Sequence, residues 1–322
     1  MFHLDVLEDA IQIDTYLREQ RPRRAVIVGG GYIGLELAEN FTRRGLEVAL
    51  LQRGDQVFHS VDKELADPLK QELERHGVDV SLCDSLVQAC GGQNGRLQEV
   101  MTSKGNHQAD LMVLATGVQP NVDLATNAGI PFGATGAIAV NTRMETGVPG
   151  VYAAGDCAEH FHRVLGKPVW IPLGTTANKQ GRVAGRNAAG GHVHFTGIVA
   201  TAVAKVFDLG VARTGLNARE ARSAGLEYET LLLESTDQAG YMPDAADLTV
   251  KLVAEKKTGR LLGGQAIGRH GADKRVDVLA TALYAGLTVS QLEELDLAYA
   301  PPFNSVRDPI QAAATRLIRK EI

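Results

Sequence analysis

Three glycines with the spacing GxGxxG stand between an apolar run and a helix pattern, a combination that suits the binding of a dinucleotide phosphate. The apolar run is 25–28, and the glycines are Gly29, Gly31 and Gly34. Gly29 permits a tight turn, Gly31 lets the backbone approach a phosphate, and Gly34 lets the helix pack close to the strand. The start of that helix offers free N–H groups and a positive dipole end to the anion. The flanking patterns favour this interpretation over a glycine-rich turn that binds nothing.

The end of the second expected strand, 47–52, holds Gln52 followed by Arg53. An acidic residue at this position would accept hydrogen bonds from the adenosine ribose and favour NAD over NADP. A neutral amide beside an arginine neither repels a 2′-phosphate nor clamps it strongly. The sequence therefore leaves both NADH and NADPH open as the nucleotide.

Composition places the chain among ordinary globular proteins, with 322 residues, 44% hydrophobic and 22% charged. This length predicts two or three domains. A net charge of −5 and a pI near 6.0 indicate no nucleic-acid partner, and no apolar run is long enough to indicate a membrane span. The acidic segment 1–10 is unlike a secretory signal, so a cytoplasmic protein is expected.

The cysteines and histidines show no spacing typical of redox pairs or metal sites. Cys83, Cys90 and Cys157 form no CxxC motif, and we expect them to be small buried residues. The nine histidines contain no HExxH or similar ligand pattern. The sequence accordingly predicts neither a disulfide framework nor a metal centre.

Hydrophobic patterning predicts an α/β fold whose parts are a Rossmann-type nucleotide unit, a glycine-rich middle region and a C-terminal α+β unit. Strands are expected at 25–28, 47–52, 78–82, 110–114, 137–141, 150–155, 200–207, 227–234, 248–254 and 261–267, with hairpin-like runs at 85–90 and 96–103. Helices are expected from Ile33, at 62–76, 174–189, 274–286 and 309–320. A glycine after the fourth buried strand, Gly117, and a carboxylate at a strand edge, Asp156, are candidate ligand contacts.

Six segments, read together and in order, resemble one known family. They are VIVGGGYIGLELAE, LMVLATGVQPN, GVYAAGDCAE, ANKQGRVAGRN, GGQAIGRHGADKRVDVLATAL and YAPPFNSVRDP. The set is similar to the FAD-dependent pyridine nucleotide-disulfide oxidoreductases, and within them to the coenzyme A disulfide reductase, NADH oxidase and persulfide reductase branch. The resemblance covers essentially the whole chain.

The resemblance implies three domains and a homodimer. They are an NAD(P)H-binding Rossmann domain at 1–120, the C-terminal half of an FAD-binding domain at 121–195, and an interface domain for dimerisation at 196–322. The nicotinamide nucleotide would contact the following residues: Gly29, Gly31, Tyr32, Ile33, Gly34, Gln52, Arg53, Thr116 and Gly117.

The same resemblance implies roles for further residues. Glu36 would lie near the nicotinamide and the flavin, Gly155 and Asp156 would bind the flavin ribityl and phosphate region, and Ala177 and Asn178 would face the flavin ring. Tyr241 and Tyr299 would reach the active site of the partner subunit. The alternatives are a solvated helix residue for Glu36, a cap for Asp156, and interface packing for the tyrosines.

The chain departs from the family pattern at its beginning. Members carry a further GxGxxG for the FAD adenosine, and then a redox cysteine, before the nicotinamide domain. This sequence has one such fingerprint, and none of its cysteines stands at the redox position. We therefore expect only half of the FAD site here, in a chain that looks truncated and inactive alone or that is complemented by a separate FAD-half polypeptide.

Two functions remain open on the sequence. The first is an NAD(P)H-dependent FAD oxidoreductase that passes a hydride from NAD(P)H to FAD and electrons onward to a disulfide, a persulfide or oxygen. Its substrate would be a small-molecule disulfide or a coenzyme A thiol compound. The second is a non-enzymatic module that binds NAD(P) and dimerises.

Overall fold

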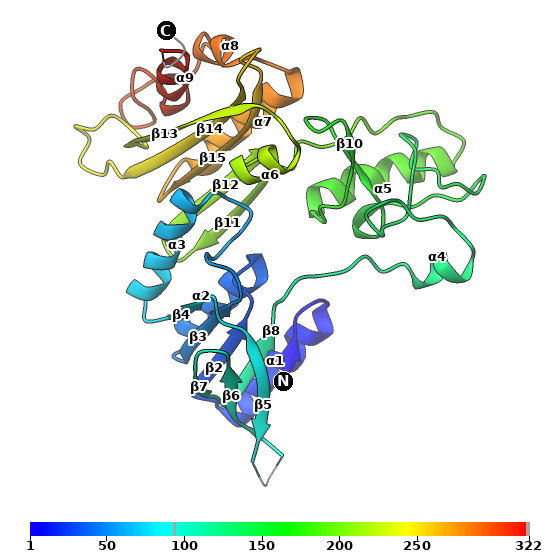
Figure 1. Ribbon diagram of the computed structural model, residues 1–322, viewed down its shortest axis with the longest axis vertical. Coiled ribbons are helices and arrows are strands. Elements are labelled where there is room, and N and C mark those ends of the chain that lie inside the picture. Colours follow the sequence, from blue (N-terminus) through cyan, green and yellow to red (C-terminus); the bar gives the residue numbers. More distant parts are fainter. Residues whose placement is uncertain (93–94, 320–322) are drawn as a thin grey trace.

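The computed structural model describes residues 1–92 and 95–319, and it consists of a parallel-sheet unit, a largely irregular middle unit and an antiparallel-sheet unit (Figure 1). This arrangement confirms the expected α/β fold class. Within the described ranges, no helix combines the length and apolar character needed to cross a bilayer.

The first unit is built on a parallel sheet with strand order β1-β8-β2-β3-β4. The apolar residues of the strand before the glycines are at most 8% exposed, as expected for a parallel strand covered on both faces. The short first strand and the helix that follows it were not predicted. The unit comprises β1 (Phe2–His3), α1 (Leu7–Gln20), β2 (Arg24–Val28), α2 (Tyr32–Arg43), β3 (Glu47–Gln52), α3 (Lys63–Arg75), β4 (Asp79–Leu82) and β8 (Leu111–Leu114).

An antiparallel meander of β5 (Leu86–Gly91), β6 (Leu97–Thr102) and β7 (Asn106–Gln108) precedes β8, and its first two strands confirm the predicted hairpin runs. After β8 the chain runs extended into the middle unit (Figure 1). That unit holds α4 (Asp123–Asn127), the 3-10 helix η1 (Gly155–Cys157), β9 (His160–His162), β10 (Lys167–Val169) and α5 (Gly174–Ala188).

Two strands predicted in the middle unit are wrong. Segment 137–141 makes only isolated bridges, from Ile138 to Phe132 and to Ala158, and segment 150–155 makes one bridge, between Tyr152 and Glu145. A strand requires a neighbour to pair with its backbone groups along its length. These apolar runs find such pairing only at single positions within the described chain.

The last unit is an antiparallel sheet with strand order β11-β12-β15-β14-β13. Strand β12 of this unit was not predicted, because its sequence LGVARTG interrupts the apolar alternation with two glycines and Arg213. Arg213 is buried beside Glu220. Helix α7 packs on β12 and β15, and α9 packs on β13 and β14. The elements are β11 (Ala202–Val206), β12 (Leu209–Gly215), α6 (Ala218–Ser223), β13 (Tyr228–Thr236), β14 (Asp247–Glu255), β15 (Leu261–Gly268), α7 (Ala272–Ala285), α8 (Val289–Glu293) and α9 (Pro309–Arg319).

The prediction that the cysteines are buried is wrong. All three thiols are free; Cys83 is exposed, and Cys90 and Cys157 are only partly buried. Cys83 directly follows β4 and has a left-handed backbone with φ of 50°, where its N–H donates to Gly54 O at 2.8 Å. The turn directs the side chain toward solvent rather than into the core.

Candidate functional site

The glycine loop between β2 and α2 meets its surroundings differently at each glycine. A Cβ on Gly29, whose φ is +113°, would collide with the carbonyl oxygen of Ala115, and a Cβ on Gly34 would collide with that of Gly29. At Gly31, apart from its two chain neighbours, no heavy atom of the described residues lies within 4 Å of the position a Cβ would take. The loop is therefore closely packed on the protein side and open on the side where the start of α2 presents its N–H groups.

Residues around the loop close it against the rest of the unit. The Tyr32 ring packs edge-on against Phe58, with centroids 4.6 Å apart, and burial raises the pKa of its hydroxyl, which hydrogen-bonds Ser60. The Phe58 N–H donates to Gly30 O at 2.7 Å. Ile33 is half-buried in the same core. These contacts hold segment 54–61 over the glycine loop.

The ends of β3 and β8 lie beside the loop, because both strands pair with β2. Gln52 Oε1 accepts the Gly30 N–H at 3.0 Å, so its side chain fastens the loop. Arg53 is exposed. Thr116 and Gly117, with φ of +114° at the glycine, are exposed after β8. The structure thus brings together the residues predicted for the nicotinamide nucleotide.

Two acids on α2 behave differently. Glu36 is exposed one turn after Tyr32, and within the described part of the chain its carboxylate has no hydrogen-bond or ion-pair partner. Glu39 is buried, where it accepts the Phe207 N–H at 2.7 Å and pairs with Lys205 at 3.2 Å. Glu36 is therefore free to meet a ligand, whereas Glu39 joins α2 to the last unit.

The residues predicted for the flavin come together at η1 and the start of α5. The Gly155 N–H donates to Gln180 Oε1 at 2.9 Å, and a Cβ on Gly155 would lie 3.4 Å from that of Ala177. Asp156 and Asn178 are exposed beside this contact. Helix α5 has no side-chain cap at its N-terminus. An exposed carboxylate next to an uncapped helix start offers both an acceptor and donors to a ligand.

Tyr241 and Tyr299 lie in the loops after β13 and before α9, with 74% and 45% of their surfaces exposed. Their hydroxyls hydrogen-bond each other, and this contact raises the pKa of Tyr299. The two loops are also joined by the Ala239 N–H, which donates to Pro301 O at 3.0 Å. Two tyrosines far apart in sequence thus form one exposed pair.

Sequence reasoning missed the buried arginine beneath this pair. Arg275 on α7 is 1% exposed and its Nη2 donates to Asp237 O and to Asn304 Oδ1, both at 2.9 Å. Its Nε lies 3.3 Å from Asp308 Oδ2. Arg275 therefore contacts both tyrosine-bearing loops. Asn304 and Asp308 in the segment FNSVRDP are the polar residues that contact Arg275, and they are the signal that could have indicated a buried arginine.

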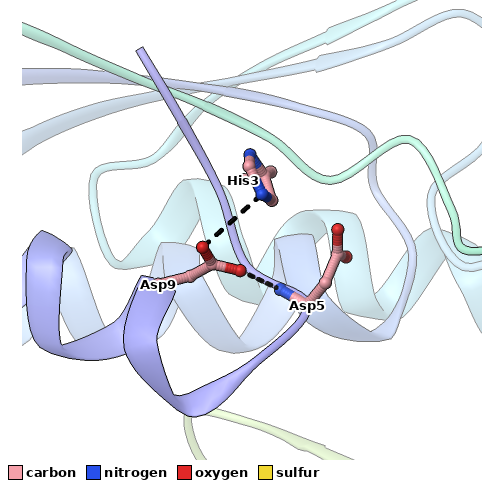
Figure 2. A group of neighbouring side chains, drawn as sticks. All are labelled: His3, Asp5 and Asp9. Carbon is pink, nitrogen blue, oxygen red and sulfur yellow. Dashed lines mark hydrogen bonds and ion pairs between the residues drawn. The ribbon is translucent and has the colours of Figure 1, made fainter.

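A group of potential metal ligands lies at the start of α1, where His3, Asp5 and Asp9 gather (Figure 2). Asp9 accepts the N–H groups of Asp5 and Val6 at 2.9 and 3.1 Å, and these hydrogen bonds lower its pKa. His3 Nε2 lies 3.5 Å from the other Asp9 oxygen. The carboxylate thus already fixes the first turn of the helix, which explains the cluster without a cation.

Comparison with known proteins places these features in context. Residues 2–181 match the model of the family described as pyridine nucleotide-disulphide oxidoreductase, and residues 201–309 match the dimerisation domain of that family. An NAD(P)H sulfur oxidoreductase (CoA-dependent) from Pyrococcus abyssi is 40% identical over 98% of this chain and 70% of its own length.

Two solved structures add detail. An NAD-dependent persulfide reductase from A. fulgidus superposes with a TM-score of 0.95 at 39% identity over 99% of this chain, which spans 59% of that protein. An engineered water-forming NADPH oxidase bound to NADPH superposes with a TM-score of 0.93 at 25% identity over 99% of this chain and 70% of its own. The engineered oxidase was made from the NADH oxidase of Lactobacillus brevis by five substitutions.

Proposed function

Because the chain belongs to the pyridine nucleotide-disulphide oxidoreductase family, whose members depend on FAD and NAD(P)H, we propose that it serves hydride transfer from NAD(P)H to FAD. The electrons would pass onward to a disulfide, a persulfide or oxygen, the last as in the water-forming oxidase. The observation that carries the proposal is the open side of Gly31 at the start of α2, in a chain that matches the family across both sheet units. A non-enzymatic module is not favoured, because the relatives are named as oxidoreductases.

Different residues of the chain suit the binding of NAD(P)H and of FAD. The glycine loop and the N–H groups of α2 would bind the NAD(P)H pyrophosphate, with Thr116 and Gly117 beside it and Glu36 orienting the nicotinamide end. The exposed Asp156 carboxylate would accept hydrogen bonds from hydroxyls of the FAD ribityl chain. The uncapped start of α5 would stabilise negative charge on the flavin ring, which is the group that takes up and passes on the electrons.

We propose domain bounds of 1–120 for the nicotinamide domain, 121–195 for the flavin contacts and 196–322 for dimerisation. Tyr241 and Tyr299 would act as a pair at the partner's site in a homodimer, where a coenzyme A disulfide or persulfide is the proposed substrate. Their mutual hydrogen bond and their exposure support this role. Sedimentation of the purified chain would test the dimer.

Flavin retention tests the central proposal. The chain is mixed with FAD, passed through gel filtration and examined for flavin absorbance, and NADH and NADPH are then titrated separately. We expect flavin to remain, and Asp156→Asn to weaken FAD binding about tenfold, the effect of one charge-assisted hydrogen bond, without changing NAD(P)H affinity. Asp123→Asn, an exposed carboxylate on α4, is the matched control.

The outcomes separate the two nucleotide sites. A colourless protein that binds NAD(P)H would contradict the flavin contacts while leaving the nicotinamide site intact, and failure of both titrations would overturn the proposal. Repeating the flavin measurement with an added polypeptide that carries further flavin contacts would test whether the site requires a complementing chain.

A further inference from the structure

The end of β3 presents hydrogen-bond donors where a site for NADH would present an acceptor. Resting on the nucleotide site proposed above, we propose that Gln52, Arg53 and His59 form a 2′-phosphate subsite that makes NADPH the preferred nucleotide. The subsite is completed by Arg219 of the antiparallel-sheet unit. Each of these residues contributes a separate observation.

Among the described residues, Gln52 keeps both of its amide N–H donors free beside the glycine loop. Its Oε1 accepts the Gly30 N–H at 3.0 Å, which fixes the orientation of the amide. Its Nε2 has no hydrogen-bond partner in residues 1–92 and 95–319. A carboxylate here would accept hydrogen bonds from the 2′- and 3′-hydroxyls of NADH and repel a phosphate. A neutral amide does not repel a phosphate, and its free N–H groups suit a phosphate oxygen.

His59 is held with a donor facing the same place. Arg219 Nη1 lies 2.9 Å from His59 Nδ1, and Arg219 Nη2 donates to His59 O. A guanidinium can only donate, so Nδ1 is the acceptor and the neutral ring carries its proton on Nε2. Burial and Arg219 lower the pKa of His59, which keeps the ring neutral.

Gly54 shows that these donors converge. A Cβ on Gly54 would collide with His59 Nε2 and would lie 3.1 Å from Gln52 Nε2, so both nitrogens border the same Cα. The His59 imidazole fills the position that a Cβ would take at Gly54, so the glycine is what lets the two nitrogens come this close to the backbone. Arg53 precedes this glycine, is exposed, and has no ion-pair partner among the described residues.

The acidic residues nearby, Asp84 and Asp55, do not offset the positive charge and the hydrogen-bond donors at this position. Asp84 accepts hydrogen bonds from Ser81, Thr102 and Ser103, and together these outweigh its burial and lower its pKa. Its carboxylate is thus satisfied by its own loop. Asp55 is an exposed carboxylate that acts on both His59 and Lys63. Two arginines, Arg53 and Arg219, and two neutral donors therefore lie at or beside the end of β3 with one exposed acid, a balance of charge that favours a phosphate dianion.

The engineered NADPH oxidase offers a comparison of residue spacing. Its substitutions replace an aspartate with alanine, place arginine at the next position and place a second arginine seven positions after the aspartate; a glycine is changed 18 positions before it. In this chain Gln52 stands 18 positions after Gly34, Arg53 follows it, and His59 stands seven positions after it. The same spacing here carries an amide, an arginine and a histidine, whereas the glycine that the engineering replaced with alanine is kept as Gly34.

Equilibrium binding to the full chain tests the proposal. We expect NADPH to bind at least about tenfold more tightly than NADH, and adenosine 2′,5′-bisphosphate to bind similarly more tightly than adenosine 5′-monophosphate. The preference should weaken as salt is added, because the subsite is partly exposed. Equal affinities, or tighter binding of NADH, would overturn the inference alone. Failure of both nucleotides to bind would overturn the nucleotide site and the inference with it.

Variants separate the contributions. Gln52→Glu keeps an acceptor for the Gly30 N–H, so the loop should fold, but the preference should reverse toward NADH. Arg53→Ala should weaken NADPH about tenfold and leave NADH unchanged. Arg23→Ala, at the opposite end of the same sheet, is its control. An unchanged NADPH-to-NADH ratio in both Gln52→Glu and Arg53→Ala would contradict the proposal.

The contribution of the antiparallel-sheet unit, made through Arg219, is tested in the same way. Arg219→Ala should release the His59 ring and reduce the NADPH preference several-fold. Its control is Arg222→Ala on the same helix, where the guanidinium bonds the Tyr228 hydroxyl instead. A preference that survives Arg219→Ala unchanged would exclude α6 from the subsite.

Discussion

Single residues of the glycine loop separate what folding requires from what binding requires. Gly34→Ala should destabilise the protein by about 1–3 kcal/mol or more, because the new Cβ would collide with the Gly29 carbonyl oxygen. Gly31→Ala should change the free energy of unfolding by less than about 0.5 kcal/mol, since nothing lies nearby.

For nucleotide binding we expect Gly31→Ala, the variant with the smaller effect on stability, to have a large effect. In the proposed site a Cβ on Gly31 would stand where the pyrophosphate approaches, so NAD(P)H affinity should fall at least about tenfold in the stable variant. Denaturant unfolding and nucleotide titration of both variants are the measurements. A Gly31→Ala protein with undiminished affinity would show that the phosphates lie elsewhere.

His162 on β9 gives the protein a predictable response to acid. Burial and Arg213 lower the pKa of His162 from 6.5 to about 4. The unfolded chain therefore binds a proton before the folded one does, so stability rises with pH across this interval and is lost as the pH falls through it. The loss due to this residue should be about 3 kcal/mol between pH 6.5 and 4.

Comparison with His162→Gln isolates that residue. The variant should show a correspondingly smaller loss of unfolding free energy over the interval, whereas His194→Gln, at an exposed histidine, should behave as the unmodified chain. Parallel pH profiles for the unmodified chain and His162→Gln would refute the assignment.

At the scale of elements, α7 supports the two tyrosine loops through Arg275. Arg275→Met would leave the Asp308 carboxylate buried without its cation, and we expect a loss of about 3–5 kcal/mol of unfolding free energy. Lys274→Met, an exposed cation on the same helix, should cost far less.

A second measurement distinguishes loop positioning from general stability. If Arg275 aligns the loops, the hydrogen bond between Tyr241 and Tyr299 should be lost in Arg275→Met and the pKa of Tyr299 should fall toward its ordinary value. Ultraviolet titration under conditions where the variant remains folded would show this. A folded variant with an unchanged tyrosine titration would mean that the loops are held by other contacts.

The elements also show where sequence reasoning succeeds and where it stops. The part of the first unit around the glycines was predictable because β2 and α2 follow clear strand and helix patterns. Strand β12 was missed because Arg213 is read as solvent-exposed until its partner Glu220 is known. Segment 137–141 was overpredicted because an apolar run does not reveal whether a neighbouring strand is available.

Some residues of the candidate site could be predicted from the sequence and others could not. The glycines were predictable because their backbone roles are local. The donor arrangement around Gln52 was not, because it depends on Gly30 turning its N–H toward the amide and on Arg219, which is 160 positions from His59 in the chain. Long-range side-chain contacts of this kind leave no periodic trace in a sequence.

At the scale of the whole molecule, a buried polar cluster joins the parallel-sheet unit to the antiparallel sheet. Lys251 Nζ lies 3.0 Å from Asp62 Oδ2, and Gln265 Nε2 donates to the same oxygen at 2.9 Å. Burial would raise the pKa of Asp62, but the contacts from Gln265 and Lys251 outweigh it and lower that pKa. The carboxylate is therefore charged and fully partnered at the joint.

Removing the Lys251 cation should weaken the packing of the parallel-sheet unit against the antiparallel sheet. Lys251→Met is expected to destabilise the protein by about 3–5 kcal/mol, because Asp62 would remain buried without its ion pair. Lys256→Met, at an exposed position just beyond the same strand, is the control. Chemical denaturation followed by tryptophan and far-ultraviolet signals would measure the effect, and equal stabilities for the two variants would argue against the joint.

Segment 54–61, which lies over the glycine loop, is fastened to another unit, and this limits which parts of the protein can be exchanged between relatives. Arg213 Nη1 and Asn217 Nδ2 both donate to Ser60 O, at 2.8 and 3.2 Å, and Arg219 holds His59 one position earlier. A chimera that exchanged only residues 1–120 with a homologue would keep its glycines and lose these restraints. Transferring the proposed coenzyme preference to a related protein should therefore require α6 to be transferred together with residues 1–120.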